Sequence, residues 1–363
     1  MAEIVLSGVS FTRSGQTVLA DIDVVVPSGV LTAIVGPSGS GKSTMLRIIA
    51  GLESPTSGTV RVGGQPVEGS PAPGLAMVFE GDSLYDHLDV GGNLELPGRL
   101  RHERPPMVTE TARRAAKQGR VLGLWRRKPA SLSGGERGMV AFARSVARSG
   151  LRVLLLDEPL SRADAHARRQ FRLDLRELHR ETGLTTVVAT NDQMEAMSLA
   201  DQLIVLIGGR IAQVGSPREV FGDPASIEVA SFVGRLPMNL FPAQVVEEGG
   251  RRWLAVGADR LDLQSAIGLD AGARVIVGIH PHELLRAEPG TPFGRVLRVT
   301  VSQIQDLGST TEIRFGLGSA PAGTYVMTDN QPPVEAVGDR LELTWVPGRL
   351  RLFEAGSGRA IPM

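Results

Sequence analysis

The stretch Leu31-Thr32-Ala33-Ile34-Val35-Gly36-Pro37-Ser38-Gly39-Ser40-Gly41-Lys42-Ser43-Thr44 decides the fold of this chain. Its second part fits the pattern G-x-x-x-x-G-K-[ST], between an apolar run that predicts a buried strand and a pattern that predicts a helix. Backbone N–H groups of such a turn and the following helix N-terminus together attract phosphate oxygens. The sequence therefore predicts a nucleotide-binding loop at residues 36–44, with Lys42 on the β- and γ-phosphates and Ser43 on Mg²⁺. A Gly/Ser-rich loop that carries one chance lysine is the alternative.

Apolar runs of similar length recur at 153–156, 185–189 and 203–207. They are continuous rather than alternating, which is typical of parallel strands buried on both faces. Between 164 and 183 the apolar spacing changes to Phe171, Leu175 and Leu178, which predicts a helix. Residues 1–235 are therefore predicted to form an α/β domain, with a basic helical insertion at about 93–130.

The pattern changes after Pro237 to short β runs separated by Gly and Pro, so residues 236–363 are predicted to form an all-β domain. Residues 272–281 and 338–347 share the pattern G-x-R-apolar-x-apolar-x-x-x-P, which indicates a duplicated strand–turn unit, as in two small barrels. Coincidence between two β-rich segments is the alternative. His280 and His282 have the spacing of metal ligands, but no third ligand is evident, so we interpret them as part of a solvated turn.

Composition disfavours several classes of protein. The 363 residues carry 39 basic and 39 acidic side chains and no cysteine. A nucleic-acid binder that neutralises phosphates would normally be basic, and a disulfide scaffold or cysteine nucleophile is excluded. The sequence contains neither an apolar run near the roughly 20 residues of a membrane-spanning helix nor a secretory signal pattern. We therefore expect a cytoplasmic chain whose contact with a membrane depends on a partner.

Two further motifs carry chemistry. The run at 153–156 ends in Asp157 and Glu158, where Asp157 is placed to hold Mg²⁺ and Glu158 to polarise an attacking water. Without the phosphate loop this would more often be a strand end with a turn. The stretch Ser133-Gly134-Gly135-Glu136 precedes a helical run, so it is either an anion-binding turn or an ordinary capping box.

The order of the three motifs resembles that in the nucleotide-binding subunits of ABC transporters. A phosphate loop comes first, the sequence LSGGE follows at 132–136, and a strand ending in Asp-Glu-Pro comes last. The resemblance spans about residues 3–235 and implies that residues 133–136 complete the ATP site of the opposite subunit. Asp164 matches the last position of the family's D-loop, S-x-L-D, and is implied as a further nucleotide contact. The β domain, with Val277-Gly278-Ile279-His280-Pro281, resembles the OB-like, TOBE-type regulatory domain of importer ATPases for maltose, other sugars and glycerol phosphates.

Three positions depart from the family pattern. Glu80 stands where the family has Gln near Mg²⁺ and the attacking water; it can ligate the metal, but it adds like charge near Glu158. Asn191 replaces a His on the γ-phosphate and donates one amide hydrogen bond at most. Arg13 stands at the position of an adenine-stacking aromatic and can stack its guanidinium plane on the base. We expect slowed but nonzero hydrolysis.

The resemblance implies an ATPase that uses ATP and Mg²⁺ and pairs with a second ATPase subunit, most simply an identical chain. The pair would lie at the cytoplasmic face of the membrane, drive two permease subunits, and import sugars or related solutes delivered by an extracytoplasmic solute-binding protein. One alternative is a catalytically weakened ATP-binding switch, which Glu80 and Asn191 motivate. Another is a soluble ABC ATPase of DNA repair or translation; the neutral charge and the β domain argue against it and against a nucleic-acid partner.

Overall fold

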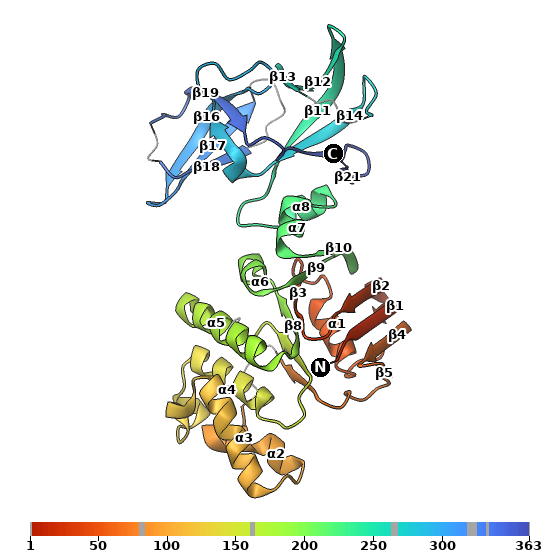
Figure 1. The fold of residues 1–363 in the computed structure, drawn as a ribbon, viewed down its shortest axis with the longest axis vertical. Helices are drawn as coiled ribbons and strands as arrows, with labels where there is room; N and C mark the ends of the chain where they lie inside the picture. Colours follow the sequence, from red (N-terminus) through yellow and green to blue (C-terminus); the bar gives the residue numbers. More distant parts are fainter. Residues whose placement is uncertain are drawn as a thin grey trace. The chain divides into compact units, whose positions relative to one another are not determined.

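A computed structural model describes this chain at residues 2–79, 84–159, 164–262, 268–317, 325–331 and 334–362 (Figure 1). The chain forms two compact units, Met1–Pro217 and Arg218–Met363. The first unit alternates strands and helices and the second is built mainly of strands, so the predicted fold class is confirmed. No helix of the described residues is long and apolar enough to cross a membrane.

The two units divide earlier than the expected boundary at residue 235. Two short helices belong mainly to the second unit: α7 (Pro217–Gly222) and α8 (Ile227–Phe232). The backbone N–H of Ile227 donates to the carbonyl oxygen of Gly358 at 2.8 Å, and Nε of Arg351 donates to the carbonyl oxygen of Gly222 at 2.8 Å. These bonds join the two helices to residues more than a hundred positions later, and no local sequence pattern records such contacts.

A six-stranded sheet in the order β10-β9-β3-β8-β7-β6 organises the first unit. Its strands are parallel except for the edge strand β10. The four apolar runs of the sequence form β3, β7, β8 and β9, whose near-complete burial explains why their residues do not alternate. The bounds are β3 (Leu31–Val35), β6 (Leu75–Val78), β7 (Val153–Asp157), β8 (Thr185–Thr190), β9 (Gln202–Ile207) and β10 (Arg210–Gly215).

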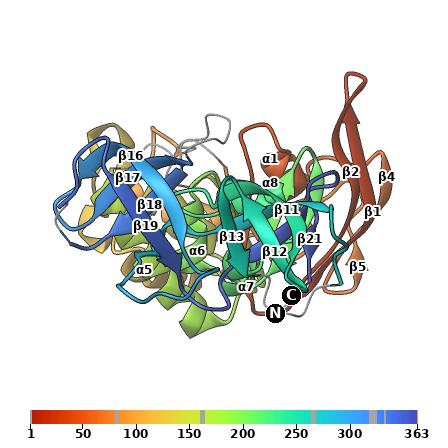
Figure 2. The same cartoon turned by 90° about the horizontal axis from the view of Figure 1, so that it is seen from above.

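Both faces of this sheet are covered. Helix α1 (Lys42–Ile49) lies on one side together with a four-stranded antiparallel sheet, and α5 and α6 lie on the other side (Figure 1, Figure 2). Met45, Leu46 and Ile49 of α1 are fully buried between the two sheets, so the helix is fixed by its apolar side. The remaining elements here are β1 (Ile4–Arg13), β2 (Gln16–Val26), β4 (Ser57–Val62), β5 (Gln65–Pro66), α5 (Ala165–Thr182) and α6 (Gln193–Leu199).

Helices fill the segment predicted as a basic insertion. They are α2 (Val90–Leu100), α3 (Pro105–Gln118) and two 3-10 turns (Leu122–Leu124 and Pro129–Ser131), and α4 (Gly134–Val146) follows this segment. Pro105 and Pro106 lie in the first turn of α3, where the missing N–H would have no helical partner, so they begin the helix. The helices pack through buried apolar residues such as Leu94, Val108 and Ala112 and leave the basic side chains to solvent.

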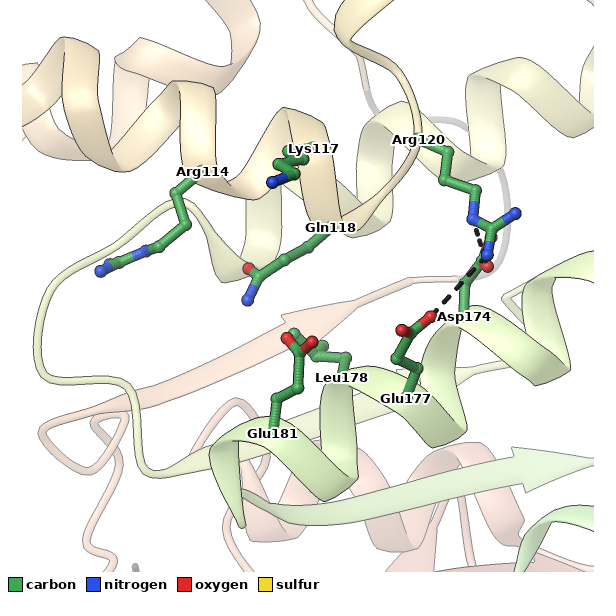
Figure 3. A pocket seen from close by; sticks show the side chains of 8 residues that line it. All are labelled: Arg114, Lys117, Gln118, Arg120, Asp174, Glu177, Leu178 and Glu181. Carbon is green, nitrogen blue, oxygen red and sulfur yellow. Dashed lines mark ion pairs between the residues drawn. The ribbon is translucent and has the colours of Figure 1, made fainter.

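A cleft of about 440 Å³ lies between α3 and α5 (Figure 3). Arg120, just after α3, crosses it: its Nε is 2.8 Å from Asp174 Oδ1 and its Nη2 is 3.7 Å from Glu177 Oε2, both on α5. The Asp174 side chain is 1% exposed, and burial raises the pKa of its carboxyl despite the opposing effects of Gln170 and Arg120. Arg120 also has a φ of +53°, which residues other than glycine rarely adopt. This ion pair therefore anchors the end of α3 to α5.

We expect Arg120→Ala to lower the free energy of unfolding by about 1–2 kcal/mol at neutral pH, because a buried carboxylate loses its cation while the exposed guanidinium limits the effect. Since the folded-state pKa of Asp174 lies above its unfolded value, the unfolded chain loses this proton first and stability falls as pH rises through that window. Removing Arg120 raises this pKa further, so the deficit in Tm should be larger near pH 8 than near pH 5. Arg114→Ala, in the same cleft but without an ion pair to a described residue, is the control for thermal melts. Equal deficits in the two variants would contradict the anchor.

The second unit contains two antiparallel sheets that share one core. Their orders are β13-β12-β11-β14-β20-β21 and β15-β19-β16-β17-β18. The two similar sequence segments form β14 and β19, one in each sheet, and their origin by duplication stays a prediction. The bounds are β11 (Asn239–Glu248), β12 (Arg251–Val256), β13 (Asp259–Asp262), β14 (Arg274–Ile279), β15 (Leu284–Arg286), β16 (Leu297–Asp306), β17 (Thr311–Leu317), β18 (Tyr325–Asp329), β19 (Arg340–Trp345), β20 (Arg351–Glu354) and β21 (Ala360–Ile361).

The interpretation of His280 as part of a solvated turn is wrong. The residue is 3% exposed, its ring stacks on Phe221 with 4.0 Å between centroids, and its Nε2 lies 2.8 Å from the Phe221 carbonyl oxygen. Burial lowers the pKa of His280 to about 4. The partner comes from α7, which the sequence pattern could not place beside it. His280 is therefore a neutral packing residue at physiological pH.

Candidate functional site

The phosphate loop joins β3 to α1 at the carboxyl edge of the parallel sheet, where ligands bind in open α/β folds. Gly36 begins the loop because no side chain fits there: a Cβ would lie 2.0 Å from the carbonyl oxygen of Leu206. Gly41 ends the loop with a φ of +101°, and a Cβ there would lie 2.6 Å from Leu19 Cδ2. The close approach to neighbouring strands therefore requires glycine at both ends of the loop.

Strand register brings residues that are far apart in sequence to this edge. Strand β8 pairs in parallel with β3 on one side and with β7 on the other, so the carboxyl ends of all three strands lie together. Val35 precedes the phosphate loop, Asp157 precedes Glu158, and Thr190 precedes Asn191. The structure thus brings together the predicted loop, the predicted water-polarising carboxylate and the predicted γ-phosphate contact.

A cavity of about 330 Å³ lies at this edge. Lys42 is 6% exposed, and its ammonium donates to the carbonyl oxygens of Gly36 at 2.8 Å and Pro37 at 3.0 Å and to Asn191 Oδ1 at 2.6 Å. These contacts match the three donors of an ammonium group. The cavity is lined by Val18, Ser38, Gly39, Gly41, Lys42, Ser43, Thr44, Glu158 and Asn191.

The loop is suited to hold an anion. Burial lowers the pKa of Lys42, while the nearby carboxylates of Glu158 and Asp157 favour its charged form. A bound phosphate would favour the charged form further. Ser40 Oγ is buried in the same loop and has no hydrogen-bond partner among the described residues. A hydroxyl without an acceptor beside a buried ammonium fits phosphate oxygens.

Ser43 and Asp157 form a pair of oxygen donors. The Ser43 hydroxyl donates to Asp157 Oδ1 at 2.8 Å, and Asp157, the last residue of β7, is 2% exposed. Mg²⁺ prefers oxygen ligands and takes only a few from protein when phosphates supply the rest. The pair therefore fits the predicted metal. Glu80, predicted as both a metal ligand and a catalytic residue, lies outside the described residues.

Glu158 adopts an unusual backbone conformation directly after β7. Its φ is +45°, which costs a residue with a side chain on the order of 1–3 kcal/mol. Its backbone N–H donates to the carbonyl oxygen of Ala189 at 2.9 Å, and this bond to β8 helps to hold the strained turn. The result is a half-buried carboxylate in the wall of the cavity that also contains Lys42 and Asn191.

Other predicted contact residues do not line this cavity within the described part of one chain; these are Arg13, Ser133, Gly134, Gly135, Glu136 and Asp164. Arg13 instead pairs with Glu53 Oε1 at 2.5 Å and lies 5.5 Å from the centre of the Phe11 ring. Asp164 caps α5, since its side chain accepts from the N–H of Ala167 at 2.8 Å. The predicted roles of these residues toward nucleotide therefore stay predictions.

The turn before α4 is a complete capping box. Ser133 Oγ accepts from the N–H of Glu136 at 3.3 Å, and Glu136 Oε2 accepts from the N–H of Ser133 at 2.7 Å. Glu136 Oε1 also lies 3.2 Å from Nη1 of Arg127. A Cβ at Gly135 would lie 2.8 Å from Cβ of Ala167, so this turn packs closely against the start of α5. The cap fixes the turn whether or not a second subunit contacts it.

Two features of the site escaped the sequence analysis. Val18 of β2 lines the cavity, and Lys42 contacts Asn191 directly although 149 positions separate them. No spacing signal could have revealed either contact, because each depends on which strands are neighbours. The proximity of Asn191 to the loop followed only from the family resemblance.

This chain is similar to known proteins over essentially its whole length. The family model described as ABC transporter matches residues 19–161. The sn-glycerol-3-phosphate import ATP-binding protein UgpC of Cupriavidus pinatubonensis is 38% identical, over 99% of this chain and 100% of its own length. The UgpC proteins of Paracoccus denitrificans and Rhodopseudomonas palustris are 38% and 36% identical, over 99% and 100% of this chain and 99% and 100% of their own lengths.

Solved structures match about three fifths of the chain. A dimeric structure of MJ0796, a bacterial ABC transporter cassette, is 28% identical with a TM-score of 0.54 and covers 59% of this chain and 99% of the cassette. A dimeric post-hydrolysis state of the same cassette, bound to ADP and Pi, is 27% identical with a TM-score of 0.53 and has the same coverage. The likeness to UgpC therefore extends beyond the cassette into the C-terminal part of the chain.

Proposed function

This chain belongs to the ABC transporter family as one of its ATPases, and from that premise we propose that it energises the import of glycerol phosphates, sugars or related carbohydrates. The observation that carries the proposal is the 36–38% identity to importer ATPases over essentially the full length of both chains. The alternative of a catalytically weakened switch finds no support in these relatives.

ATP would bind with its phosphates on residues 36–44. Lys42 would exchange its bonds to the carbonyl oxygens of Gly36 and Pro37 for bonds to the β- and γ-phosphates and would keep its bond to Asn191. The backbone N–H groups of the loop would hold the remaining oxygens. Ser43 and Asp157, together with Glu80, are the residues that would hold Mg²⁺, which when bound would neutralise charge on the phosphates. Arg13 remains our proposal for the residue that stacks on adenine.

Glu158 would orient and polarise the water that attacks the γ-phosphate. Its carboxylate lies in the cavity wall with Lys42, which supports that role. Asn191 would donate from its amide nitrogen to the γ-phosphate, since its amide oxygen accepts from Lys42. A neutral amide stabilises developing charge less than an imidazolium does, so we expect hydrolysis to be slow but nonzero.

We propose that two copies of this chain pair around ATP. The turn Ser133-Gly134-Gly135-Glu136 and Asp164 lie outside the cavity of their own chain, which supports a role toward the partner's nucleotide. The dimeric cassette structure supports the pairing of two chains. The unit Met1–Pro217 would act as the nucleotide-binding domain and the unit Arg218–Met363 as the regulatory domain.

The partners beyond the pair follow from the proposed import function. Two membrane permease subunits would bind the pair at the cytoplasmic face of the membrane, and a solute-binding protein would deliver substrate to the permeases from outside. Deleting the gene and measuring uptake of radiolabelled sn-glycerol-3-phosphate and maltose tests the proposal. Uptake of one solute should be lost and restored by the unmodified chain but not by Lys42→Ala. Unchanged uptake of both, with no membrane protein copurifying, would argue against import of these solutes.

Asn191→Ala should lower kcat for ATP hydrolysis about tenfold, because it removes one hydrogen bond to a charged group, worth roughly 1.5 kcal/mol. Asn191→His should match or exceed the rate of the unmodified chain, because imidazole also donates and can carry charge. Phosphate release at saturating ATP and Mg²⁺ measures both rates. If neither substitution changes kcat, Asn191 has no part in hydrolysis.

A further inference from the structure

Thr190 is the centre of a hydrogen-bonded group directly behind Asn191. Its hydroxyl donates to Glu195 Oε2 at 3.0 Å and accepts from the backbone N–H of Asp192 at 3.1 Å. Asp192 Oδ1 in turn accepts from the backbone N–H of Glu195 at 2.9 Å, at the start of α6. These bonds fix the residues on both sides of Asn191, so they restrict the backbone from which its side chain extends.

Burying this hydrogen-bonded group costs free energy of folding. Thr190 and Glu195 are 3% and 6% exposed, and Glu195 Oε1 has no hydrogen-bond partner among the described residues. Burial raises the pKa of Glu195 and Asp192 adds to that effect, while the hydrogen bond from Thr190 and the charges of Arg172 and Arg168 on α5 only partly oppose it. A buried carboxyl with one unsatisfied oxygen costs free energy. We therefore expect this group to act on the position of Asn191 rather than on the stability of the short helix α6.

The geometry points to Thr190 and Glu195 as positioning residues that hold Asn191 against Lys42. The contact they would maintain is the 2.6 Å hydrogen bond from the Lys42 ammonium to Asn191 Oδ1. It fixes which atom of the amide faces the lysine and leaves the amide nitrogen to donate elsewhere. This inference rests on the proposed role of Asn191 in ATP hydrolysis.

A double-mutant cycle in the full-length chain tests the inference, with ATP and Mg²⁺ as the probe. Thr190→Val removes the hydroxyl with little change of shape and should lower kcat about fivefold, with a smaller change in KM. In the Asn191→Ala background the same substitution should change kcat by less than about twofold, because there is no side chain left to position. Thr190→Ser keeps the hydroxyl and Glu195→Gln keeps an acceptor, so both should retain kcat within about twofold.

Thr186→Val is the matched control. Thr186 is a buried threonine on the same strand, and its hydroxyl donates to the carbonyl oxygen of Leu184, the hydroxyl's one hydrogen-bond partner among the residues that the structure describes. It should lower the melting temperature about as much as Thr190→Val without the loss of kcat.

Three results would overturn the inference: an unchanged kcat in Thr190→Val, the same factor of loss in both backgrounds, or an equal loss of kcat in Thr186→Val. An Asn191→Ala variant with the full rate would also overturn it and would leave the ATPase function in place. Failure of the proposed ATPase function would give a different result. The unmodified chain would then show no ATP hydrolysis that the Lys42→Ala substitution removes.

Discussion

Lys42→Ala is expected to weaken ATP binding about 100-fold. The ammonium is buried beside the loop, and each charge-assisted hydrogen bond it makes to phosphate is worth roughly 1.5–3 kcal/mol, so the loss of two such bonds removes about 3 kcal/mol. Neighbouring groups cannot compensate, because Glu158 and Asp157 carry the same charge as the phosphates. Titration calorimetry with ATP, with and without Mg²⁺, measures the change.

Lys117→Ala is the matched control for this variant. It removes an exposed lysine from α3, away from the phosphate loop, and should bind ATP as the unmodified chain does. The whole interpretation of residues 36–44 fails if Lys42→Ala and Lys117→Ala bind ATP equally well.

Glu158→Gln is expected to lower kcat about 10²–10³-fold while ATP binding is retained. Glutamine has the size of glutamate, so the strained turn after β7 can persist, but its amide cannot take a proton from the attacking water. Because hydrolysis reopens the proposed pair, the variant should accumulate as a dimer in the presence of ATP and Mg²⁺. Phosphate release and light scattering during size-exclusion chromatography measure the two effects.

Glu181→Gln provides the comparison for Glu158→Gln, since Glu181 is an exposed glutamate on α5 outside the cavity. It should leave both the rate and the oligomeric state unchanged. An unchanged kcat in Glu158→Gln would assign the water-polarising role to another group. A monomer in ATP, despite slow hydrolysis, would instead contradict the pairing of two chains.

Local patterns predicted much of the fold. The apolar runs became β3, β7, β8 and β9, and the apolar spacing between 164 and 183 became α5, because burial on both faces or on one helical side leaves a periodic trace in sequence. The burial of His280 was missed because it depends on Phe221 of α7, which is 59 positions away in sequence, and a contact between distant segments leaves no such trace.

The sequence by itself predicted a phosphate-binding strand–loop–helix and placed the chain with the ABC ATPases, because glycine, lysine and serine at fixed spacing dictate the local backbone and its charge. Only the tertiary structure decided that Asn191 holds the loop lysine, that Ser43 meets Asp157, and that Thr190 and Glu195 stand behind them. These contacts arise from the order and register of β3, β8 and β7. Hydrogen bonds between whole strands set that order, and no spacing along the chain specifies it.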